Sequence, residues 1–72
     1  MAGYGVIVEL ADDGTYGAWS PELAGCVAAA DDYDGCVALM VEAVAGHLAA
    51  MRAYGDPVPL PRTVGAVTVY PA

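Results

Sequence analysis

The sequence predicts an α+β domain of β-β-β-α-β order, an antiparallel-type sheet covered by one long helix. Short runs of alternating apolar residues are separated by the Asp13-Gly14 pair and by a corner between Pro21 and Gly25. A stretch with helical spacing of apolar residues follows, and a short β-branched run closes the chain. With 72 residues the chain forms one domain, residues 1–72, whose core is thin because a domain of this size buries only about 60% of its unfolded surface.

The first two strands form a hairpin. Residues 4–10 alternate, with Tyr4, Val6, Val8 and Leu10 on one face and Ile7 and Glu9 on the other. Asp13-Gly14 predicts a type I′ turn, because both central residues of that turn need positive φ. The second strand covers residues 15–20, and the opposite parity of Tyr16 and Trp19 places these two aromatic residues on different faces.

The corner after the second strand leads into the third. Pro21 cannot donate to a sheet ladder, so the second strand ends there, and Gly25 allows the backbone to turn back. Residues 26–30 then form the third strand. The run is rich in alanine, which has poor strand propensity, so the bounding proline and glycine carry this prediction.

The long helix is predicted to start with Asp32 as its N-cap and to run to about Tyr54. Short acidic side chains accept hydrogen bonds from free N–H groups and suit the positive end of the helix dipole. Gly55 is expected as the left-handed residue after the helix, followed by Pro57. The predicted buried stripe consists of Val37, Met40, Val41, Val44, Leu48 and Met51. Gly46, in mid-helix, predicts a close approach by another backbone.

The segment after the helix is predicted to be extended and then to form the last strand. Residues 56–61 are too rich in proline for a sheet interior, whereas residues 64–70 are β-branched and alternate. One helix covers only one face of such a sheet. The other face is predicted to be apolar and to need a partner, with Ile7, Trp19, Val27, Val67 and Val69 or their neighbours exposed on it.

Charge and composition exclude several classes of partner. The formal net charge is −7, and Arg52 and Arg62 are the only basic residues, so direct binding to nucleic acid or to anionic membranes is not expected. An acidic domain suits a basic protein partner, although charge can also serve solubility alone. A hydrophobic content of 58% indicates either a surface that a partner buries or self-association as a homo-oligomer, a dimer or a tetramer.

Cysteine usage and the N-terminus indicate a cytoplasmic protein. Cys26 and Cys36 match no zinc pattern, one histidine cannot complete one, and we expect two reduced and largely buried thiols. The first residues contain no basic region and reach Asp12 too soon for a signal peptide. Charged residues and glycines interrupt every apolar run before the roughly 20 residues of a membrane span.

No catalytic or metal-binding set emerges. The acidic cluster of Asp31, Asp32 and Asp34 lacks two essential ligands of a calcium loop, so capping explains it better. His47 lies about 16 Å along the helix from Cys36, which excludes that catalytic pair, and Cys26 in an apolar strand is more simply a core residue. We therefore expect a protein that is not an enzyme and that has no catalytic residues, metal or cofactor.

The arrangement of these residues resembles the HicB family of antitoxins. The resemblance is carried by Tyr4-x-Val-x-Val-Glu9, by Asp13-Gly-x-Tyr16-x-Ala-Trp19-x-Pro21-Glu-Leu-x-Gly25-Cys-Val-Ala-Ala, by the acidic helix start and by Tyr54-Gly-Asp-Pro-Val-Pro. It implies a fold similar to a truncated ribonuclease H domain without catalytic function. It also implies that a small basic RNA-cleaving toxin, HicA, is neutralised by occlusion. Nothing after Tyr70 matches the family's C-terminal DNA-binding module, which implies the short form.

The resemblance and the charge pattern together predict a partner-binding site. Tyr16 and Trp19 are the expected anchors, and the expected steering charges are Glu9, Asp12, Asp13, Glu22 and Asp56. One alternative is a stand-alone homo-oligomeric domain without a toxin, which would pack through the small helix residues Gly46, Ala49, Ala50 and Ala53. Another is a vestigial hydrolase that would depend on Asp13 and Mg²⁺.

Overall fold

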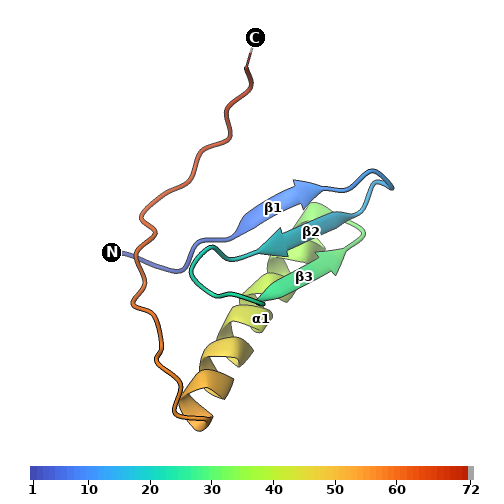
Figure 1. The fold of residues 1–72 in the computed structure, drawn as a ribbon. Helices are drawn as coiled ribbons and strands as arrows, with labels where there is room; N and C mark the ends of the chain where they lie inside the picture. Colours follow the sequence, from blue (N-terminus) through green and yellow to red (C-terminus); the bar gives the residue numbers. More distant parts are fainter. Residues whose placement is uncertain (72) are drawn as a thin grey trace.

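Three antiparallel strands and one helix form the folded part of the computed structural model, which describes residues 1–71 (Figure 1). The strands are β1 (Ile7–Leu10), β2 (Tyr16–Trp19) and β3 (Val27–Ala30), and the helix is α1 (Tyr33–Ala53). The sheet order is β1-β2-β3, so β2 is central and β1 and β3 are edge strands. The predicted α+β class and the order of these four elements are confirmed, and each strand is shorter than predicted.

The hairpin between β1 and β2 has a three-residue loop, so the predicted type I′ turn is wrong. The N–H of Gly14 donates to the carbonyl of Ala11 (3.0 Å), and the N–H of Ala11 donates to the carbonyl of Thr15 (2.8 Å). Gly14 alone has positive φ in this loop, at 87°. This is the pattern of a type I turn followed by a left-handed residue. Asp13 stays at negative φ, where its carboxylate accepts bonds from the backbone and hydroxyl of Thr15.

Helix α1 is capped at both ends as predicted. The Asp32 carboxylate accepts a hydrogen bond from the N–H of Gly35 at 2.6 Å, with extended backbone at Asp32. At the other end Gly55 has a φ of 72° and donates to the carbonyl of Arg52. The backbone N–H of Asp56 donates to the carbonyl of Met51, which completes a Schellman motif.

The core lies between α1 and one face of the sheet, and it reaches the corner between β2 and β3. Its buried apolar members are Ala18, Leu23, Cys26, Cys36, Met40 and Leu48. Leu23, in the corner, is only 2% exposed, although the sequence pattern did not predict it as a core residue. Both cysteines are buried, as expected, and they form no disulfide with each other.

The buried face of α1 differs from the predicted stripe. Met40 and Leu48 are buried, and Val44 and Met51 pack beside them, but Val41 is 66% exposed. The helix packs mainly against β3 and β2 and least against β1. This orientation turns Cys36 inward in place of Val41. The expected close approach at Gly46 is also wrong, because a Cβ atom built there would have no neighbour within 4 Å.

The final strand predicted over residues 64–70 is not formed. Gly3 and Thr63 exchange two backbone hydrogen bonds in an isolated antiparallel bridge, and beyond it the chain leaves the domain in an extended conformation (Figure 1). Within residues 1–71, no backbone hydrogen bond joins residues 64–71 to another segment. A strand needs a neighbour to satisfy its backbone groups, and residues 64–71 have none in the part of the chain that the structure describes.

Helix α1 is more continuously apolar than expected, since no stretch of the sequence was expected to approach a membrane span. It is long and apolar enough to cross a membrane by length and composition, with a mean hydropathy of 1.4 over its best window. The core helix of a water-soluble domain can have the same length and apolar composition. Here one side of α1 packs on the sheet through Cys36, Met40 and Leu48, and the rest of the helix surface is open, since only 17% of this apolar stretch is buried.

Candidate functional site

The face of the sheet opposite α1 is uncovered, and three apolar side chains cross it in one row. The register pairs Ile7 with Trp19 and Trp19 with Val27, so these residues come from all three strands. Their exposed fractions are 36%, 42% and 65%. We call this surface, with Glu9 beside it, the open face. The expectation of an exposed apolar sheet face is confirmed for Ile7, Trp19 and Val27.

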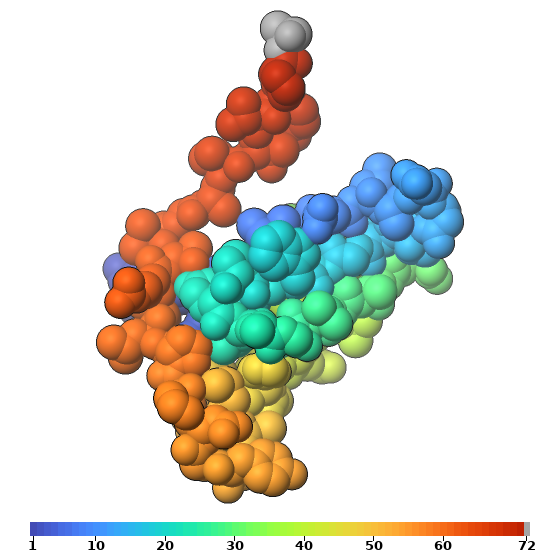
Figure 2. All heavy atoms as spheres, viewed as in Figure 1, coloured from blue at the N-terminus to red at the C-terminus, as the bar shows by residue number. Residues whose placement is uncertain are grey.

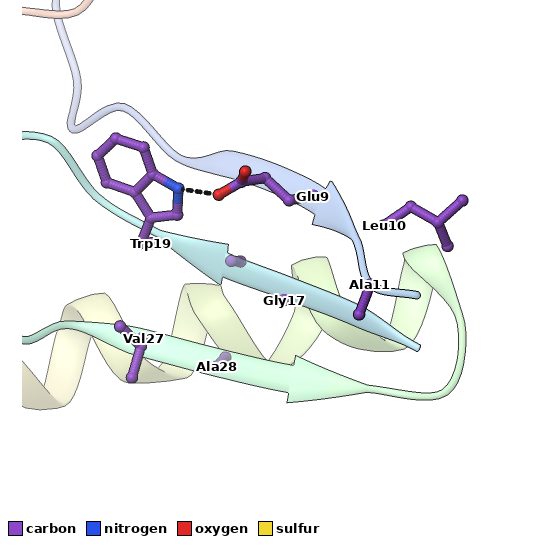
Figure 3. Close-up of a pocket in the computed structure, with 8 residues that line it drawn as sticks. Glu9, Leu10, Ala11, Gly17, Trp19, Val27 and Ala28 are labelled. Atoms are coloured by element: carbon purple, nitrogen blue, oxygen red, sulfur yellow. Dashed lines mark hydrogen bonds between the residues drawn. The ribbon is translucent and has the colours of Figure 1, made fainter. Parts of the chain in front are cut away.

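A hydrogen bond fixes the largest side chain of the open face. The indole Nε1 of Trp19 donates to Oε1 of Glu9 at 2.6 Å, as Figure 3 shows. The two residues lie on neighbouring strands, and Glu9 pairs with Gly17, two residues before Trp19. Because Gly17 has no side chain, the indole and the carboxylate meet across it. The contact places a carboxylate directly beside the apolar row.

A shallow depression with a volume of about 540 Å³ lies on the open face, beside Trp19 and Val27. Glu9, Leu10, Trp19 and Val27 are among the residues that line it (Figure 3). Leu10 is 67% exposed and was predicted on the helix side of the sheet. Leu10 is the last residue of β1, the strand that α1 covers least. Strand parity alone therefore does not predict that its side chain is exposed. A broad, open apolar surface of this kind suits a protein partner better than a small molecule, which needs a concave pocket.

The loop between β1 and β2 adds negative charge at one end of the open face. Asp12 and Asp13 are exposed at its tip. The hydrogen bonds from the hydroxyl and the N–H of Thr15 lower the pKa of Asp13 below its ordinary value. Asp13 therefore keeps its negative charge at neutral pH. The loop therefore places two carboxylates at this end of the sheet, while the carboxylate of Glu9 is directed along the sheet toward Trp19 (Figure 3).

The structure places the other predicted site residues elsewhere. Tyr16 lies on the helix side, where its ring meets that of Tyr33 edge to face at 6.2 Å. Glu22 binds its own chain: its carboxylate accepts bonds from the N–H of Gly5 (2.8 Å), the hydroxyl of Thr63 (2.8 Å) and the N–H of Arg62 (3.4 Å). The bonds from Gly5 and Thr63 are the main causes that lower the pKa of Glu22. Asp56 follows the end of α1, which lies far from the loop between β1 and β2 in Figure 1.

Both cysteine thiols are buried in the core. Burial raises the pKa of Cys26, which favours its neutral and unreactive form. The Sγ atom of Cys36 is buried and donates to the carbonyl of Tyr16 at 3.6 Å. Within residues 1–71, no three side chains among histidine, cysteine, aspartate and glutamate come together as a metal site would require.

Comparison with known proteins identifies the family of this chain. A search of curated proteins and a search of solved structures each gave no significant match. A family model does match over residues 4–72, nearly the whole chain, and it is described as the HicB-like antitoxin of bacterial toxin-antitoxin systems. The match includes the three strands that build the open face and the helix that covers the opposite face of the sheet. The chain therefore belongs to the HicB-like antitoxin family.

Proposed function

We propose that this chain neutralises a small, basic, RNA-cleaving toxin of the HicA type by covering it with the open face. The observation that carries the proposal is the apolar row of Ile7, Trp19 and Val27, with the carboxylate of Glu9 bonded to Trp19. Family membership supports the antitoxin role and a toxin partner in general. The mechanism is occlusion, so the chain acts by binding and performs no chemistry, and it does so in the cytoplasm, where such a toxin meets RNA.

Charge supports a basic partner. Each chain carries a formal charge of −7, and its two arginines lie in α1 and in the segment after it, outside the open face. Glu9 on the face and Asp12 and Asp13 in the adjoining loop are all exposed. Such a field speeds the encounter with a positively charged protein and disfavours nucleic acid. Charge thus selects the partner and sets the rate of association.

The apolar row supports tight binding once contact is made. Interface energy concentrates in a few large side chains that become fully desolvated, and tryptophan is prominent among them. Trp19 is held by Glu9 before any partner arrives, so little side-chain entropy is lost when the surface is covered. We assign Trp19 the role of anchor, and Glu9, Asp12 and Asp13 the role of steering charges. Tyr16, Glu22 and Asp56 lie outside the proposed surface.

The proposal is tested by co-expressing the chain with the product of a short basic reading frame next to its gene. The wild-type chain should restore growth, and Trp19→Ala should weaken toxin binding roughly thirtyfold or more and release toxicity. Tyr54→Ala is the matched control, since Tyr54 is an aromatic residue 83% exposed at the end of α1. The substitutions Asp12→Lys and Asp13→Lys should slow the association of the chain with the toxin and make the association rate less dependent on salt concentration. If all these variants neutralise the toxin as well as the wild type, the open face is not the toxin-binding surface.

A further inference from the structure

The carboxylate of Glu9 is held against the apolar row of the open face. Its Oε1 atom accepts the hydrogen bond from the indole of Trp19 at 2.6 Å (Figure 3). The three strands contain no basic residue, so no cation of the sheet lies beside this charge. Glu9 therefore differs from Asp12 and Asp13, which lie in the loop beyond the end of β1 and touch no part of the apolar row.

A partner that covers Trp19 must also cover Glu9, because the two side chains are bonded to each other and border the same depression. In the free chain the carboxylate is exposed to water, and in Figure 2 neither α1 nor residues 56–71 cross over the three strands, which are coloured blue to green. A carboxylate that loses its water is strongly destabilised unless a cation and new hydrogen bonds replace that water. In a complex, the partner itself has to supply the cation.

The depression beside Trp19 suits a long side chain that lies flat across it. Its volume of about 540 Å³ is far larger than a bound water or ion needs. Leu10 and Val27 are its other large apolar residues, and Glu9 is the one charged residue among the described residues that line it. Gly17 lies between the larger side chains in Figure 3, and the hollow exists because this position has no side chain.

The carboxylate of Glu9 can still accept several hydrogen bonds. A carboxylate has about four lone-pair positions on its two oxygens, and the indole of Trp19 donates one bond, to Oε1. A metal ion does not fit this place, because within residues 1–71 no three metal-binding side chains come together. The complementary ligand is an organic cation that has several donors and an apolar stem.

An arginine side chain has each of these properties. Its planar guanidinium donates two parallel bonds to a carboxylate and stacks on the face of an aromatic ring. Its methylene stem covers apolar surface. A lysine ammonium is a compact and strongly hydrated charge, so it pairs with a carboxylate but gains less from a flat surface beside an indole.

We propose that the depression is a subsite for one arginine side chain of the toxin. The guanidinium bonds to Glu9 and stacks against the ring of Trp19, and the stem lies over Gly17. This inference rests on the proposed function and deepens it, because it gives Glu9 a direct contact in addition to its role as a steering charge. Trp19 is the positioning residue for the carboxylate, which its hydrogen bond holds in place before the arginine arrives.

The first test compares two variants that each lose one negative charge. Glu9→Gln keeps the length of the side chain and an oxygen that accepts the indole bond, and it should weaken toxin binding roughly tenfold or more, mainly through faster dissociation. Glu42→Gln is the matched control, since Glu42 is exposed on α1, on the other side of the sheet. It should weaken binding less than about threefold. The single indole N–H signal in the nitrogen–proton NMR spectrum of the free Glu9→Gln chain checks that Trp19 stays in place.

The second test identifies the group on the toxin with double-mutant cycles. Each arginine of the purified toxin is replaced in turn by lysine, and its dissociation constant is measured with the wild-type chain and with Glu9→Gln. One of these replacements should weaken binding to the wild-type chain roughly tenfold and should have a much smaller effect on binding to Glu9→Gln. If every arginine can be replaced by lysine without such coupling, the subsite does not take an arginine and the proposal is wrong.

The outcomes separate this inference from the proposed function. If Trp19→Ala binds the toxin as well as the wild type, the open face itself is not the toxin-binding surface. If Trp19→Ala loses binding but Glu9→Gln behaves like Glu42→Gln, the open face stands and the arginine subsite is refuted.

Discussion

Replacing Leu23 by alanine tests the core at the corner between β2 and β3. The side chain is 2% exposed and packs in the cluster that includes Met40 and Leu48. Losing three buried carbons costs about 2.4 kcal/mol at roughly 0.8 kcal/mol each, and the cavity raises the total to about 3 kcal/mol. For 72 residues, a whole-domain stability of about 4–11 kcal/mol is expected, so this loss is a large part of it.

Urea unfolding measures the effect of Leu23→Ala, followed by helix circular dichroism and by the fluorescence of Trp19, the only tryptophan. The chain concentration is held fixed, because self-association would add to the apparent stability. Leu60→Ala is the matched control, since Leu60 is 74% exposed, and it should change stability by less than about 0.5 kcal/mol. If Leu23→Ala costs no more than Leu60→Ala, the corner is not part of the core.

Three further predictions concern single contacts. The lowered pKa of Glu22 makes its contribution to stability fully present above about pH 4.5, and that contribution is lost as the pH falls through the folded pKa. The urea midpoint of Glu22→Gln should therefore fall less steeply with acid than that of the wild type, and parallel curves would contradict the assigned hydrogen bonds. Gly14→Ala should cost about 1–2 kcal/mol in urea unfolding because of its φ of 87°, whereas Gly65→Ala, at a position without positive φ, should cost far less. Ser20 is 4% exposed, and its hydroxyl has no partner among residues 1–71, so Ser20→Ala should raise stability by about 1 kcal/mol by the same assay; a loss of similar size would show that the hydroxyl is satisfied in solution.

The elements with a local cause could be predicted from the sequence. The carboxylate of Asp32 and the left-handed Gly55 fix the two ends of α1, and both act within a few residues of chain. Pro21 and Gly25 bound the corner in the same way. Strand parity correctly placed Trp19 and Tyr16 on opposite faces, because side-chain direction in a strand alternates whatever the strand packs against.

Features that depend on tertiary packing could not be predicted in this way. Val41 fits a helical stripe as well as Met40 does, and only the angle at which α1 crosses β3 and β2 decides which face is buried. Leu23 lies in an irregular corner without periodicity. The strand predicted at residues 64–70 has the right composition, but composition does not supply a hydrogen-bonding neighbour.

In the candidate site, too, the features with a local cause could be predicted and those set by tertiary contacts could not. The exposed row of Ile7, Trp19 and Val27 follows from parity and from the presence of a single covering helix. The bond between Trp19 and Glu9 depends on the register of β1 against β2, which a three-residue loop sets, and this loop was predicted wrongly. Glu22 was expected to be a steering charge because it is acidic and follows a turn. Its contacts with Gly5 and Thr63 join segments far apart in sequence, which no local pattern reveals.

The accessibility of Trp19 in the presence of the toxin tests the central proposal most directly. The indole is 42% exposed in the single chain, and acrylamide quenching of its fluorescence reports that exposure without a mutation. The basic toxin is added in a form whose own tryptophans are replaced by phenylalanine. We predict that quenching falls as the complex forms and that it is restored by high salt. Quenching that stays unchanged in a saturated complex would show that the toxin binds elsewhere and would contradict occlusion by the open face.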